Sequence, residues 1–339
     1  MFIKKGFSNK IYLREQKKKI LERLRDFDKL YLEIGGKLLY DGHASRVLPG
    51  FKAQDKINLL KSLGKLNIIY CVSAKDLSSL RHLEDSGFNY RLQTLNDLKE
   101  IKRHGFKGIH VCITRYSGQK VANDFRIELQ KLGYSVYFHY EIEGYPNNLE
   151  KVIKGYKSQE FILTNSKLVI VTGVAGGSGK MAVAMAQIYN ESKRDKIKAG
   201  YSKYELFPIW NLPLSHPINV AYEAATADLG DYNMVDPYYL KKYKKIAVNY
   251  NRDVNNFAIL KKIFLKIFRK GGFQFYSPTE MGVNMAKKGI IDDKICCNAA
   301  IREIKRRRRY YEKEFNAGRE NKKTITRMKE IYKLVGLKW

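Results

Sequence analysis

The sequence LVIVTGVAGGSGKM occupies positions 168 to 181 of the chain. Leu168 to Val171 is apolar and rich in β-branched residues, which favours a buried strand, and Met181, Met185 and Ile188 recur on one face of a helix. A turn between a strand and a helix directs backbone N–H groups towards the helix N-terminus, where the helix dipole also favours negative charge. The stretch therefore predicts a strand, an anion-binding turn and a helix.

The turn is similar to a phosphate-binding P-loop, with two departures from that pattern. In G-x-x-x-x-G-K-[ST] the first glycine would fall where the chain has Val174, and Met181 replaces the serine or threonine that holds Mg²⁺. We therefore expect ATP, another nucleotide or a phosphorylated small molecule as ligand, and we give Mg²⁺-dependent cleavage less weight. The alternative is a tight structural turn with Lys180 in solvent. The predicted phosphate-binding residues are Gly176, Gly177, Ser178, Gly179 and Lys180.

Length and composition limit the class of protein. The chain has 339 residues, of which 44% are hydrophobic, so we expect two or three globular units, each with a packed core. The sequence shows neither a signal-peptide pattern nor an apolar run of about 18 residues, so we expect a cytoplasmic protein without membrane contact. Its 4 cysteines include no CxxC pair and are expected to be reduced thiols.

The formal net charge of +30 raises nucleic-acid binding as a hypothesis. Most basic residues are dispersed, as a general compositional bias would produce. The segment from Ile301 to Trp339 is denser, with 14 lysines and arginines against 5 glutamates, and it includes the run Arg306 to Arg309. A solvated basic helix face is the favoured interpretation, and an anionic partner is the alternative. One expected apolar stripe comprises Cys297, Ile301, Ile304, Tyr311 and Phe315.

Strand-like and helical patterns alternate along most of the chain. This alternation predicts an α/β fold of P-loop or Rossmann-like type, whose parallel sheet is covered on both faces and binds ligands at the carboxyl ends of strands. We expect one α/β unit at 1–155, a second with the phosphate-binding turn at 156–280, and an all-helical basic segment at 281–339. The expected strands are Leu30–Ile34, Asn67–Ser73, Gly108–Thr114, Tyr134–Tyr140, Leu168–Val171 and Ile246–Asp253.

A second glycine-punctuated segment, Asp41 to Gly50, carries reactive side chains. His43 is a candidate for proton transfer, and Arg46 is a candidate for binding a carboxylate or phosphate. An ordinary loop with a surface histidine is the alternative. His110 and His139 fall inside expected strands and are interpreted as structural histidines.

Further candidates lie in the second half of the chain. At the carboxyl end of the last expected strand, Asn251 and Arg252 are predicted to bind the ligand and Asp253 to act in catalysis, with a helix cap as the alternative. Asp228, in an expected helix, is a second candidate carboxylate. The stretch from Lys198 to Pro217 is not expected to be helical throughout, and its part from Phe207 to Pro217 is expected to form a rigid loop that closes over the ligand.

Several long motifs together resemble the bacterial family DUF1846, also called UPF0371, from about Lys5 to the C-terminus. Members of that family usually continue into a further C-terminal α/β domain, so the resemblance implies that this chain lacks it and is a truncated or regulatory form. Some members carry an ATP-dependent peptidase label, but no HExxH or GxSxG motif is present here. The motifs that carry the resemblance are Gly35-Gly36-Lys37, His43 to Gly50, Gly176 to Met181, Phe207 to Pro213, Ala221 to Leu229, Val248 to Asp253, Ser277-Pro278-Thr279 and Met281 to Ala286.

The leading hypothesis is a protein that binds a phosphorylated ligand over Gly176 to Lys180, with phosphoryl transfer or hydrolysis as its enzymatic form. Lys180 would contact phosphate, Arg46 and Arg252 would neutralise charge, and Asp228 or Asp253 would supply a carboxylate. The alternatives are a non-enzymatic sensor or assembly protein that forms homo-oligomers, a nucleic-acid-binding protein and, last, a peptidase. The ligand, the reaction and the oligomeric state are left open.

Overall fold

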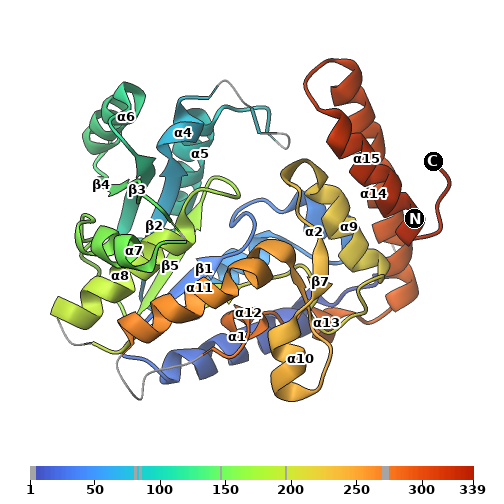
Figure 1. The fold of residues 1–339 in the computed structure, drawn as a ribbon, viewed down its shortest axis with the longest axis horizontal. Helices are drawn as coiled ribbons and strands as arrows, with labels where there is room; N and C mark the ends of the chain where they lie inside the picture. The colour runs from blue at the N-terminus through green and yellow to red at the C-terminus, as the bar shows by residue number, and fades with distance from the viewer. Residues whose placement is uncertain (1–4, 80–81, 84–85, 146, 195–196, 269–274) are drawn as a thin grey trace.

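A parallel sheet of seven strands forms the centre of the molecule (Figure 1). The computed structural model describes residues 5–79, 82–83, 86–145, 147–194, 197–268 and 275–339. Five of the six expected strands belong to the sheet, and each matches its expected range within two residues at either end. In spatial order the strands are β4 (Ser135–Tyr140), β3 (Ile109–Tyr116), β2 (Leu66–Ser73), β5 (Leu168–Gly173), β1 (Lys29–Ile34), β6 (Ala199–Tyr204) and β9 (Gly282–Val283).

Successive residues of the central strands point into two different hydrophobic clusters. Leu30 and Leu32 of β1 belong to one cluster, whereas Tyr31 between them belongs to the other. Because side chains alternate across a strand, a strand that is apolar at every position must be covered on both faces. The apolar runs thus explain the prediction of a doubly covered parallel sheet, which the structure confirms.

Helices cover both faces of this sheet (Figure 1). One cluster takes residues from the first six helices and from helices late in the chain. The other takes residues from helices that follow β4, β5 and β8. On the first face lie α1 (Asn9–Arg25), α2 (Gly42–Val47), α3 (Gln54–Lys61), α4 (Ala74–Leu77), α5 (Tyr90–Arg103), α6 (Lys120–Lys131), α9 (Pro217–Ala225), α13 (Ala286–Gly289), α14 (Asp293–Asn316) and α15 (Lys322–Leu334); on the second lie α7 (Leu149–Lys157), α8 (Lys180–Arg194), α11 (Asn251–Ile267) and α12 (Pro278–Met281).

The expected strand Ile246–Asp253 is only partly correct. Its central residues form β8 (Val248–Tyr250), which pairs with β7 (Asn233–Val235) in a separate antiparallel ribbon preceded by a short 3₁₀ turn, Ala227–Leu229. The last three residues, Asn251 to Asp253, instead begin α11. Between the two strands of the ribbon runs α10 (Pro237–Tyr243).

Two strands of the sheet were not expected from the sequence. One of them, β6, lies just before the expected loop and pairs with β1 along its whole length. The segment expected to be all-helical from residue 281 begins with β9, which pairs with the end of β6. The expected boundaries near residues 155 and 280 therefore divide strands of one sheet.

Two long helices, α14 and α15, end the chain and lie together at one side of the molecule (Figure 1). The buried face of α14 differs from the expected stripe: Glu303 and Arg307 are buried, whereas Phe315 is 40% exposed. Three arginines of the run 306–309 form ion pairs with acidic residues of the same helix, Arg306 and Arg307 with Glu303 and Arg308 with Glu312. Within the described ranges, no helix has the length and apolar content needed to cross a membrane.

Candidate functional site

A cavity of about 650 Å³ lies where the carboxyl ends of the sheet strands meet. Its wall includes Glu33 of β1, Thr114 of β3, His139 of β4 and Lys203 of β6, together with the glycine-rich turn after β5. Ligands of parallel sheets bind at this edge, because the backbone and side chains of several strands converge there. The cavity is therefore the principal candidate site.

Three glycines of the glycine-rich turn, Gly176, Gly177 and Gly179, line the cavity with backbone atoms. Gly177 and Gly179 have φ of +78° and +79°, which L-residues rarely adopt. A Cβ on Gly179 would also lie 2.8 Å from Oγ1 of Thr114, the hydroxyl that donates a hydrogen bond to the Ser178 carbonyl at 2.8 Å. The turn ends at Lys180, the first residue of α8, so the N-terminus of a 15-residue helix opens towards the cavity.

Two polar side chains of this turn are buried. The Ser178 hydroxyl has no hydrogen-bond partner among the residues that the structure describes, although the residue is fully buried. Lys180 is only 8% exposed and donates from Nζ to the carbonyl of Ala175 at 3.2 Å. The alternative that placed Lys180 in solvent is therefore wrong for this side chain.

On another wall of the cavity, three acidic side chains lie around one lysine. Lys203 is 4% exposed, forms an ion pair with Asp253 and donates to the Tyr250 hydroxyl at 2.7 Å. Glu205 lies 3.9 Å from the same ammonium group, and Glu33 accepts a hydrogen bond from Tyr201 at 2.6 Å. Burial, partly offset by Lys203, raises the pKa of Glu205 to about 8, so this carboxyl group holds a proton at neutral pH.

Next to this cluster, Arg252 extends from α11 and donates to Asp231 at 2.6 Å. Asp231 is 1% exposed, and its second carboxylate oxygen has no partner in the part of the chain that the structure describes. Both residues line the cavity. Asn251 does not contribute to the cavity wall: its side chain accepts from the backbone of Tyr232 and donates to the Gly230 carbonyl.

His43, on α2, contacts a carboxylate behind the cavity and a pair of aromatic rings. Its Nδ1 lies 3.3 Å from Oε1 of Glu303, and its ring lies 5.2 Å from that of Phe207 and 6.4 Å from that of Tyr222. Its Nε2 is buried and has no hydrogen-bond partner within the described ranges. Burial lowers the pKa of His43, against the raising effect of Glu303.

Besides Asn251, two further predicted site residues, Arg46 and Asp228, lie outside the cavity. Arg46 binds both oxygens of Glu303, at 2.7 and 3.1 Å, and lines a second cavity on the far side of the 37–42 segment. Asp228 accepts a hydrogen bond from the Tyr311 hydroxyl at 2.9 Å. Of the predicted loop over the site, Phe207 lines the cavity, whereas Ile209 is held by the side chain of Asn219.

Several titratable residues of the cavity wall were not predicted as site residues from the sequence. His139 was interpreted as structural, yet it lines the cavity with its Nε2 unpartnered among the described residues. Burial lowers the pKa of His139 to about 4. Asp231 lies just before β7 of the ribbon, Lys203 lies in β6, and Glu205 follows β6 directly. These residues were missed in part because β6 has no apolar run in its sequence. Recognition of β6 as a strand would have placed Lys203 and Glu205 at the correct edge of the sheet.

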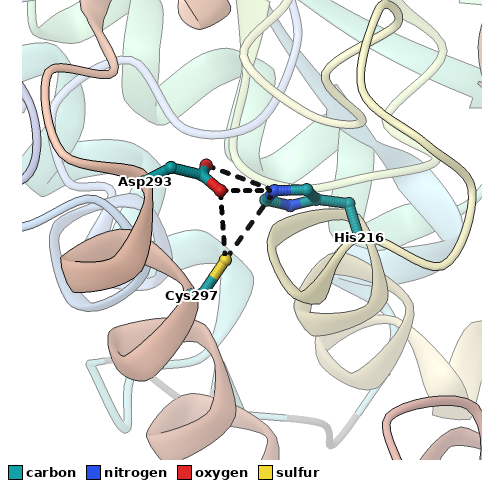
Figure 2. Close-up of side chains that lie close together, drawn as sticks. All are labelled: His216, Asp293 and Cys297. Carbon is teal, nitrogen blue, oxygen red and sulfur yellow. Dashed lines mark hydrogen bonds and ion pairs between the residues drawn. The ribbon is translucent and has the colours of Figure 1, made fainter.

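Outside the cavity, His216, Asp293 and Cys297 lie close enough to hold a metal ion (Figure 2). The His216 Nε2 is 3.2 Å from Asp293 and 3.7 Å from the Cys297 sulfur. However, Nδ1 of His216 accepts a hydrogen bond from the backbone N–H of Ile218, at the N-terminus of α9. Neutral imidazole then carries its proton on Nε2 and has no lone pair there for a metal. The cluster therefore fits a hydrogen-bonded contact between α9 and α14 better than a metal site.

Comparison with known proteins identifies the family. A family model described as "Domain of unknown function DUF1846, N-terminal" matches residues 5–336. The chain belongs to the DUF1846 family. Similar proteins include a UPF0371 protein of Clostridioides difficile, 43% identical over 339 residues, and UPF0371 proteins of Clostridium botulinum strain Kyoto and Clostridium tetani, each 44% identical, over 336 and 342 residues respectively.

These matches cover 98 to 99% of this chain and 66 to 67% of each relative, so the DUF1846 member described here spans about two thirds of their length. The matches confirm the resemblance found in the sequence. They do not support the expectation that the protein lacks a C-terminal domain, because the coverage shows only how far the two sequences align. The family description states no function, and the residues of the cavity wall are the part of the structure that bears on it.

Proposed function

We propose that this DUF1846 protein binds a nucleotide or another phosphorylated small molecule, with a phosphate group over Gly176 to Lys180. The observation that carries the proposal is the turn itself. It places the N-terminus of α8 and the buried Lys180 at one wall of the cavity. Backbone N–H groups, a helix dipole and an ammonium group are the donors that phosphate oxygens require.

The remainder of the ligand extends towards the cluster of Glu33, Lys203, Glu205 and Asp253. Carboxylates and a lysine accept from and donate to hydroxyl groups, which suits a ribose or another sugar. Glu205, whose pKa is raised to about 8, can exchange a proton near neutral pH, and His43, whose pKa is lowered by burial, adds a neutral proton acceptor. These two groups favour an enzyme of phosphoryl transfer or hydrolysis over a sensor without turnover.

The proposal does not include Mg²⁺ as a bound cofactor. Met181 cannot coordinate it in the way that a P-loop hydroxyl does, and Asp253 and Glu205 already face the ammonium group of Lys203. A divalent cation would have to displace that ion pair. Binding is therefore expected to persist in EDTA.

The test is calorimetric titration of ATP, ADP, GTP and several sugar phosphates, with Mg²⁺ and with EDTA, into the purified protein. Lys180→Ala is expected to weaken binding of the preferred ligand at least tenfold. Lys131→Ala, which removes an exposed lysine at the end of α6, is the matched control and is expected to leave affinity unchanged. If no phosphorylated compound binds the folded protein, or if both variants bind like the wild type, the proposal fails.

A further inference from the structure

The environment of His43 fixes which of its two nitrogens carries the proton. Glu303 is 2% exposed and accepts hydrogen bonds from Arg46 and Arg306, and Arg307 lies 3.3 Å from it. Burial alone would raise the pKa of Glu303. The hydrogen bonds from His43, Arg306 and Arg46 have the larger combined effect and lower the pKa of Glu303 well below its usual value. Glu303 is therefore ionised and can only accept hydrogen bonds.

An ionised Glu303 requires that Nδ1 of His43 be the donor across the 3.3 Å contact. In the neutral ring the other nitrogen, Nε2, then carries a lone pair. That nitrogen is the buried one without a partner in the described part of the chain, and His43 is part of the cavity wall. A polar atom left without a partner in a buried site costs free energy, so a ligand that donates a hydrogen bond to it would stabilise the complex.

We infer that His43 and Glu303 form a carboxylate–imidazole dyad whose Nε2 takes a proton from a hydroxyl group of the cavity ligand or of a water molecule beside it. This inference rests on the proposed function. In the step, the O–H bond breaks, its electron pair stays on oxygen, and an N–H bond forms at Nε2. The imidazolium keeps its Nδ1 proton hydrogen-bonded to the Glu303 carboxylate, and the oxygen is left as a nucleophile.

In this dyad His43 touches the ligand, whereas Glu303 is a positioning residue that acts through His43 and comes from α14, 260 positions away in the sequence. The charged and titratable groups around the imidazole are Glu303 and Arg307 on α14, Asp41 before α2, and Tyr222 on α9, with Arg46 and Arg306 behind Glu303. Burial is the largest influence and lowers the pKa of His43. The ring is therefore a neutral proton acceptor at pH 7.

The tautomer can be measured without knowledge of the reaction. In the ¹⁵N-labelled full chain, two-bond ¹H–¹⁵N correlations report which ring nitrogen is protonated, and His43→Gln assigns the signals. We expect neutral His43 at pH 7 with the proton on Nδ1, and we expect Glu303→Gln to reduce that preference. A proton on Nε2, or an imidazolium at pH 7, would overturn the inference even if Glu303→Gln did not fold.

A second readout separates this inference from the proposed function. With a phosphorylated ligand that depends on Lys180, His43→Gln should retain affinity within about threefold and lose at least 100-fold in any turnover. The Nε2 signal of the wild type should shift when that ligand is added. An unmoved Nε2 signal with such a ligand bound contradicts the dyad alone, whereas failure of every phosphorylated compound to bind contradicts the proposed function.

Discussion

Two histidines of this protein contact carboxylates of the same helix and are fixed in opposite ways. His43 directs Nδ1 to Glu303 of α14, which leaves a lone pair on the buried Nε2. His216 directs Nδ1 to a backbone N–H donor and Nε2 to Asp293 of α14. The partner of Nδ1 thus decides what the other nitrogen can do: one imidazole can accept a proton in a cavity, and the other serves as a hydrogen-bond donor between two helices.

The two carboxylates also differ in burial. The Glu303 side chain is 1% exposed and the Asp293 side chain is 58% exposed. Ionic contacts contribute little at the surface because solvent screens them, whereas removal of one buried partner leaves the others uncompensated. Loss of Glu303 should therefore lower the stability of the protein more than loss of Asp293 does.

The largest expected effect is the loss of the buried carboxylate. Glu303→Ala leaves Arg46, Arg306 and Arg307 without their shared acceptor, and we expect it to lower the free energy of unfolding by about 3 to 5 kcal/mol. Asp293→Ala, on the same helix, should cost less than about 1 kcal/mol. Denaturant titrations measure both. Equal losses of unfolding free energy in the two variants would show that burial of the carboxylate does not matter here.

A third imidazole, His139, is buried without an acidic partner in the described part of the chain, and its effect on stability should depend on pH. Its pKa is about 4 in the folded protein, against 6.5 for an unburied ring, because burial disfavours the charged form. Protonation of His139 therefore favours the unfolded chain. The free energy of unfolding should be unaffected above pH 6.5 and should fall as the pH falls towards 4, by about 3 kcal/mol at most. We expect His139→Gln to flatten the pH dependence of stability in this range, as followed by denaturant titration.

His82→Gln, which changes an exposed histidine, serves as the control for this experiment. If His82→Gln and His139→Gln alter the acid dependence to the same degree, burial at the cavity wall does not set the titration of His139.

A smaller effect is expected at the glycine-rich turn. Gly177→Ala introduces only backbone strain, since no atom lies within 4 Å of the added Cβ, and should cost about 1 kcal/mol. Gly179→Ala has the same strain and also places its Cβ 2.8 Å from Thr114 Oγ1, so it should cost about 2 to 3 kcal/mol. Thermal unfolding of the two variants side by side measures the difference. A cost at Gly179 no greater than at Gly177 would show that the turn relaxes away from β3.

The smallest expected effect concerns metal at the His216 cluster. Because Nε2 of His216 carries the proton, Zn²⁺ at low micromolar concentration should not raise the melting temperature of the wild type relative to His216→Gln. Thermal unfolding with a Zn²⁺ series makes this comparison. A rise in the wild type alone would mean that the hydrogen bond from Ile218 is given up and the cluster binds metal.

Much of the sheet could be predicted from the sequence because β1 to β5 contain apolar runs. β6, with the sequence AGYSKY, contains no such run, and its polar side chains are buried through specific partners, such as Tyr201 with Glu33 and Lys203 with Asp253. Those partners come from distant parts of the chain. A local pattern could not show that such a segment is a buried strand.

The candidate site was predictable only in part, for the same reason. The turn at Gly176 to Lys180 and the cluster at Arg252 and Asp253 carry local signals, and the structure places both at one cavity. The acceptor for Arg46 and His43 is Glu303, more than 250 positions away, and it lies on a helix whose expected apolar stripe did not include it. No spacing rule connects α2 to that residue.

If phosphate lies over the glycine-rich turn, as proposed, a side chain added at Gly176 should interfere with its binding. Gly176 lines the cavity, its φ lies outside the positive region, and an added Cβ would meet no atom within 4 Å. Gly176→Ala should therefore unfold at the wild-type temperature and, in calorimetric titration, bind the preferred phosphorylated ligand at least tenfold more weakly, because the methyl group occupies space beside the backbone N–H groups. Wild-type affinity in this folded variant would mean that phosphate does not lie over the glycine-rich turn.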